Sequence, residues 1–114
     1  METSDLNRPK EDAVAQALEA MWRKFLPDIG ARVDLLAAAA HATATGALNR
    51  EQRAAAHAAA HQLAGTLGTF GLARGTVVAR ELEMRLGGDG LAPGDARDME
   101  RSVAELRAVV AGRK

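Results

Sequence analysis

His61 is the residue of this chain whose surroundings best suit chemistry. At the helical spacing of about 100° per residue, Gly65 and Gly68 fall within about 40° of His61, while Leu63 and Phe70 lie on the opposite, apolar face. A glycine inside a helix costs about 0.5–1 kcal/mol relative to alanine, so two glycines beside one imidazole indicate that another molecule comes close. The spacing therefore predicts a histidine that faces solvent or a partner, while an exposed histidine taken by itself could also have no role.

The run from Ala60 to Glu83 resembles the signature of histidine-containing phosphotransfer (HPt) domains. In that signature an alanine and an acceptor histidine precede a leucine, a basic residue, a glycine, small residues, an apolar-glycine pair and a second helix that ends in leucine-glutamate. The matching positions here are Ala60, His61, Leu63, Gly65, Gly68, Phe70-Gly71 and Leu82-Glu83. The sequence departs from the signature at Ala64, where the family often carries lysine.

The resemblance implies a phosphorelay carrier. His61 would accept a phosphoryl group from an aspartate of one receiver domain, by attack of the neutral imidazole on phosphorus, and pass it to another receiver. The partner would bring the aspartate and its magnesium, so this chain would need no cofactor of its own. Gly65 and Gly68 would then give clearance for the receiver, with Gln62 at its edge.

Three alternatives stay open around this face. Since Ala64 lacks the charge of the family's lysine, the chain could instead be a helical adaptor that docks receiver-like domains without transfer. The glycines could also serve close packing of a neighbouring helix, which would bury His61. His57, one turn before His61, could share a metal with it, but no carboxylate joins them on this helix, so we expect a supporting residue and no metal site.

The remaining motifs argue against an independent enzyme. Gly87 to Gly90 lacks the following lysine and the strand that a nucleotide-binding loop requires, so we expect a turn between helices and no ATP site. The chain has no cysteine, which excludes thiolate chemistry and disulfides within it. The expected role is therefore a phosphotransfer module that its partners charge and discharge.

Composition indicates one domain and argues against a nucleic acid partner. A chain of 114 residues with 47% hydrophobic content suits a single core. Fifteen basic residues balance fifteen acidic ones, whereas proteins that bind a phosphate backbone usually carry a basic excess, so we expect no nucleic acid partner. The polar start of the chain and the lack of a run of about 18 apolar residues predict no membrane contact and a cytoplasmic location.

Helical periodicity and punctuation predict an all-α fold. We expect a flexible N-terminus over residues 1–8 and a bundle over residues 9–112, namely an up-down four-helix bundle with an additional N-terminal helix. Pro9 would open that first helix, which ends near Phe25, and Pro27 would start the next, which ends near residues 41–43. Asn49 would cap the third helix, and Gly71 would end or bend it. The fourth helix would stop at Gly87, and the fifth would start at Pro93.

The apolar faces predict a core of alanine, leucine and valine. In the first helix one face should be buried, with residues Val14, Leu18, Met21, Trp22 and Phe25. The charged residues of the fourth helix should form an ordinary solvated face, namely Arg80, Glu81, Glu83 and Arg85. Since every strongly apolar face then has a place inside one bundle, we expect a monomer.

Overall fold

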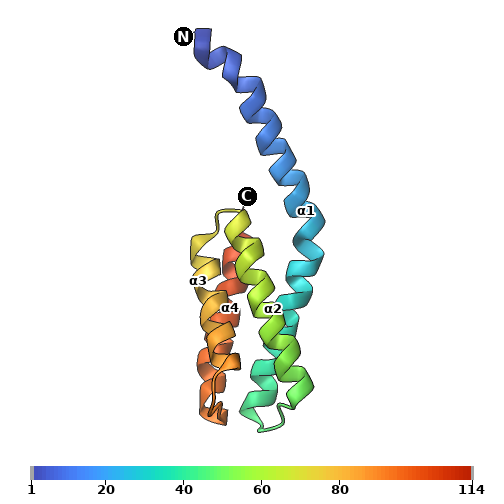
Figure 1. Ribbon diagram of the computed structural model, residues 1–114, viewed down its shortest axis with the longest axis vertical. Coiled ribbons are helices and arrows are strands. Elements are labelled where there is room, and N and C mark those ends of the chain that lie inside the picture. Colours follow the sequence, from blue (N-terminus) through green and yellow to red (C-terminus); the bar gives the residue numbers. More distant parts are fainter. Residues whose placement is uncertain (1, 114) are drawn as a thin grey trace.

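The computed structural model describes residues 2–113, with side chains from Pro9 onward. In this part of the chain there are four α-helices and no strand (Figure 1). The helices are α1 (Glu2–Ala44), α2 (Arg50–Thr69), α3 (Ala73–Gly87) and α4 (Ala96–Gly112), and a 3₁₀ turn, η1 (Pro93–Asp95), leads into α4. The all-α class and the helical bundle are confirmed.

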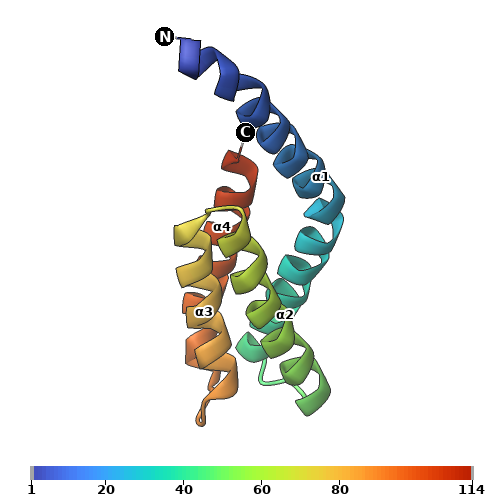
Figure 2. The ribbon, with the colours of Figure 1, turned by 45° about the horizontal axis from the view of Figure 1, so that its top comes forward.

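The predicted break at Pro27 is wrong, and with it the separate N-terminal helix. α1 runs without interruption through Pro9 and Pro27, and Figure 2 shows it as one curved helix. Proline removes one backbone hydrogen bond and disfavours the helix by about 3 kcal/mol. Trp22 before it and Ile29 after it are both buried against the bundle, so packing on both sides of Pro27 outweighs this penalty.

The other helix boundaries follow the local signals in the sequence. The Asn49 side chain accepts a hydrogen bond of 2.7 Å from the backbone N–H of Gln52, which confirms the predicted cap of α2. α2 ends at Thr69, and Gly71 follows with φ of +73°, a conformation that glycine adopts without strain. α3 ends at Gly87, and Pro93 opens η1.

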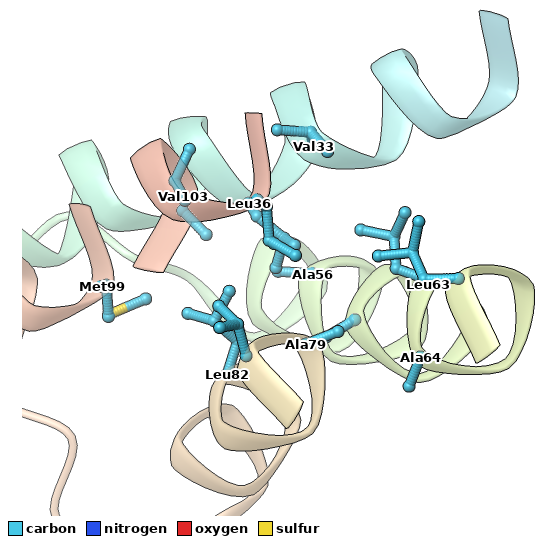
Figure 3. Close-up of a cluster of buried hydrophobic side chains, with 14 of the residues drawn as sticks. Val33, Leu36, Ala56, Leu63, Ala64, Ala79, Leu82, Met99 and Val103 are labelled. Atoms are coloured by element: carbon cyan, nitrogen blue, oxygen red, sulfur yellow. The ribbon is translucent and has the colours of Figure 1, made fainter. Parts of the chain in front are cut away.

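The core is made of aliphatic side chains and small residues from all four helices. Figure 3 shows part of it, with Leu36 of α1, Leu63 of α2, Leu82 of α3 and Met99 of α4 meeting in one cluster. Alanines fill the helix contacts, and the fully or almost fully buried ones are Ala39, Ala40, Ala56, Ala59, Ala60 and Ala79. Such small side chains let the helices approach closely, as the composition predicts.

α1 is much longer than its neighbours and projects past the end of the bundle (Figure 1). Trp22 is buried and packs edge-on to Phe70, with ring centroids 5.1 Å apart. The prediction that Val14, Leu18 and Met21 are buried on the same face is wrong, because they are 61%, 37% and 41% exposed on the part of α1 that projects past the bundle (Figure 1). The reason for expecting a monomer therefore does not hold, and the oligomeric state stays a prediction.

Two further expectations concern the N-terminus and membrane-spanning helices. The flexible N-terminus over residues 1–8 stays a prediction, since Met1 lies outside the described residues and residues 2–8 are described only as helical backbone. Among the described helices, none combines the length and the apolar character needed to cross a membrane.

Candidate phosphotransfer site

The register between α2 and α3 determines which side chains surround His61. The two helices run in opposite directions from the turn at residues 70–72, and three of the close approaches between them show how they are paired. These join His57 with Gly87, His61 with Glu83, and Gly68 with Thr76. Between one pair and the next, the residue number falls on α2 by as much as it rises on α3. The three pairs therefore belong to one regular antiparallel register.

His61 is exposed and held by a carboxylate. Its side chain is 73% exposed, and Nδ1 lies 2.7 Å from Oε2 of Glu83, which is 24% exposed. An ionised carboxylate can only accept hydrogen bonds, so Nδ1 carries the proton and donates it to Glu83. In the neutral ring the lone pair is then on Nε2, the nitrogen that Glu83 does not engage. The hydrogen bond to Glu83 thus fixes the tautomer of the ring and leaves Nε2 as the nucleophile.

A shallow surface groove of about 630 Å³ lies beside His61, between α2 and α3. From α2 it is lined by His57, His61, Ala64 and Gly65. From α3 and its end it is lined by Arg80, Glu83, Met84, Gly87 and Gly88. The groove therefore has one cation from α3, a carboxylate already bonded to the histidine, and Met84, an apolar side chain that is 75% exposed.

Gly65 and Gly68, which the helical projection places together, have different surroundings. Gly65 lines the groove beside His61, and a Cβ built on it would meet no atom within 4 Å. Gly68 faces α3, where its Cβ would lie 3.4 Å from Thr76 Oγ1. Open space over Gly65 agrees with clearance for a partner, and the exposure of His61 contradicts the alternative in which close helix packing buries it.

The remaining predicted site residues are only partly brought together. His57 lines the same groove, half-buried, with its Nε2 2.9 Å from where a Cβ on Gly87 would lie. Ala64 is buried at the edge of the groove, and its carbonyl accepts a 3.2 Å hydrogen bond from the Thr76 hydroxyl. Gln62 points elsewhere, because its side-chain oxygen accepts a 2.8 Å hydrogen bond from Nε of Arg32 on α1.

The contribution of α3 to this site was not predicted. Arg80 and Glu83 were expected on an ordinary solvated face, yet both line the His61 groove. The signal was present in the spacing, because Arg80, Glu83, Met84 and Gly87 recur at three- and four-residue steps and so share one side of a helix. Across residues 9–113, no cluster of three or more potential metal-ligating side chains accompanies these histidines.

Comparison with known proteins agrees with this site. The chain matches the Hpt domain family over residues 12–112, which include all four helices apart from the first turns of α1. This chain belongs to the Hpt domain family. Domains of this family carry out histidine phosphotransfer in two-component signalling, so the family and the exposed His61 point to the same chemistry.

The Hpt domain is also similar to a much longer curated protein. It is 35% identical over 91 residues to Protein RcaC of Microchaete diplosiphon, an alignment that covers 79% of this chain. The matched region is 14% of the length of RcaC, so the relative contains a great deal that this Hpt domain does not match. No solved structure gives a significant match.

The Glu83 carboxylate gives a prediction for this Hpt domain. Glu83→Ala removes the acceptor of the Nδ1 proton, so the ring loses its fixed tautomer and orientation, and we expect phosphorylation of His61 to slow about 10-fold, equal to about 1.4 kcal/mol. The measurement is the rate of phosphoryl transfer from a phosphorylated receiver domain.

Glu83→Gln is the matched control, because its amide oxygen can still accept the same hydrogen bond without the negative charge. We expect a smaller loss than in Glu83→Ala. Equal rates for the wild type and Glu83→Ala would show that the bond between His61 and Glu83 has no part in the reaction.

Proposed function

We propose that this Hpt domain is a phosphorelay carrier, in which His61 takes a phosphoryl group from an aspartate of one receiver domain and gives it to another. The observation that supports the proposal most strongly is the exposed His61 side chain with Nδ1 bonded to Glu83, beside an open groove. An exposed reactive nitrogen suits a partner that brings the rest of the catalytic site, since the chain need only present the nucleophile.

The proposed step conserves atoms and charge. The Nε2 lone pair attacks phosphorus, the bond between phosphorus and the aspartyl oxygen breaks, and its electrons return to the receiver as a carboxylate. Glu83 keeps the proton of Nδ1 in a hydrogen bond and stabilises the positive charge that the ring gains. Transfer to a second receiver is the same step in reverse, and magnesium belongs to the receiver.

The role of the groove in docking is part of the proposal. Gly65 leaves the space over one turn of α2 free, and Met84 offers an exposed apolar contact on α3. Exposed apolar groups next to a reactive residue are typical of small, transient protein interfaces. The receiver would thus contact both helices of the hairpin when its aspartate reaches His61.

The test is transfer between purified proteins. The chain is incubated with a phosphorylated receiver domain and magnesium, and its intact mass is measured at neutral pH. We expect the addition of one phosphoryl group that is lost in acid, and its removal when a second, unphosphorylated receiver is added. Receiver binding without any gain in mass would instead favour the adaptor function, and the absence of both would contradict the proposal.

A further inference from the structure

A phosphoryl group on His61 needs a positive charge that α2 does not supply. The group brings nearly two negative charges to a surface where Glu83 already carries one. Ala64, at the position where the family signature often has lysine, is buried and uncharged. Unless another residue compensates, phosphorylated His61 would face only repulsion from its own domain.

The register of the hairpin identifies the residue opposite Ala64. The close approaches of His61 to Glu83 and of Gly68 to Thr76 set the pairing between α2 and α3. Three residues forward from His61 is Ala64, and three residues back from Glu83 is Arg80. Arg80 therefore lies across the helix contact from the position of the missing lysine, and it lines the groove that contains His61.

Arg80 is also available for a new ligand. Its side chain is exposed, and no hydrogen bond or ion pair engages it among the side chains of residues 9–113. The neighbouring arginines of α3 are occupied, since Arg74 binds Glu105 at 2.9 Å and Arg85 binds Asp95 at 2.6 Å. A guanidinium can donate two parallel hydrogen bonds to phosphate oxygens, which suits this position.

We propose that Arg80 of α3 is the cation that binds the phosphoryl group on His61, in place of a lysine on α2. This inference rests on the proposed phosphorelay function. Arg80 would contact the phosphoryl oxygens during transfer and in the phosphorylated state, and it would offset the charge of Glu83 one turn away on the same helix. The supporting charge of the site thus comes from the second helix of the hairpin.

The experiment compares Arg80→Ala, Arg80→Lys and Arg97→Ala, the last an exposed arginine of α4 outside the groove. The first readout is the rate of transfer from a phosphorylated receiver, which we expect to fall about 10-fold in Arg80→Ala, the modest effect of an exposed charge. Arg80→Lys should keep most of the rate, and Arg97→Ala should match the wild type.

A second readout reports on the phosphoryl group itself. In ³¹P NMR of the phosphorylated chain at neutral pH, hydrogen bonds from a nearby guanidinium change the chemical shift of the phosphoryl group. We expect the ³¹P chemical shift of Arg80→Ala to differ from that of the wild type, and that of Arg97→Ala to match it. Circular dichroism of each variant checks that the fold is retained, so that the difference can be assigned to the missing guanidinium.

The outcomes separate this inference from the proposed function. If the wild type is phosphorylated but Arg80→Ala keeps both the rate and the ³¹P chemical shift of the wild type, the role of Arg80 is wrong and the carrier function stands. An equal loss of rate in Arg97→Ala would show that only the net charge of the surface matters, which also overturns the role of Arg80. If the wild type gains no phosphoryl group from any receiver, the carrier function itself fails.

Discussion

His61→Gln will abolish phosphorylation of this Hpt domain while leaving its fold intact. Glutamine offers a side-chain amide in place of the imidazole, and an amide nitrogen is not a nucleophile toward phosphorus. The side chain it replaces is 73% exposed and outside the core, so we expect a change in stability of no more than about 0.5 kcal/mol. The measurement is the intact mass after incubation with a phosphorylated receiver and magnesium.

The chain contains its own matched controls. His57 lies one turn earlier in the same groove, and His41 lies in the last turn of α1. We expect His41→Gln to take up phosphoryl groups like the wild type, and His57→Gln to do so with at most a moderate change in rate. Undiminished phosphorylation of His61→Gln would assign the reaction to another residue.

Gly65→Leu will lower transfer sharply and stabilise the protein at the same time. A Cβ at Gly65 meets no atom of another residue's side chain or of another helix within 4 Å, so there is room for a side chain to leave the helix at this position. Replacement of a helical glycine stabilises by about 0.5–1 kcal/mol. The leucine, however, stands one turn from His61 on the same face and keeps the receiver from close approach, for which we expect a loss of roughly 100-fold in transfer rate.

Gly30→Leu is the control for this substitution. Gly30 is a helical glycine of α1 with the same open surroundings, but it lines a groove between α1 and α4. It should gain stability in urea denaturation as Gly65→Leu does, without losing transfer. A Gly65→Leu variant that transfers at the wild-type rate would show that the receiver does not need this space.

Local chemistry explains what could be predicted from the sequence. The Asn49 cap, the glycine at residue 71 and the aliphatic periodicity of α2 to α4 act within a few residues, so helix ends and core faces follow from them. Pro27 is the instructive exception, because burial of Trp22 and Ile29 on the same bundle retains a helix that local propensity would break. The exposure of Val14 depends equally on tertiary structure, since it reflects where the other helices end.

The candidate site also has a part that local sequence predicts and a part that depends on tertiary structure. His61 and Gly65 could be found because they lie on one helix and share its periodicity. Glu83 is 22 residues from His61, and its contact depends on the turn between α2 and α3 and on the register that follows from it. Counting outward from a turn centred near Leu72 would have paired these helices, so the α3 half of the site was within reach of the sequence.

The most direct test of the account is to locate the phosphoryl group in the phosphorylated wild-type chain by tandem mass spectrometry of peptides prepared at neutral pH. We expect a single phosphohistidine at His61. A phosphoryl group on His57, on His41 or on any other residue, with His61 unmodified, would contradict the central claim.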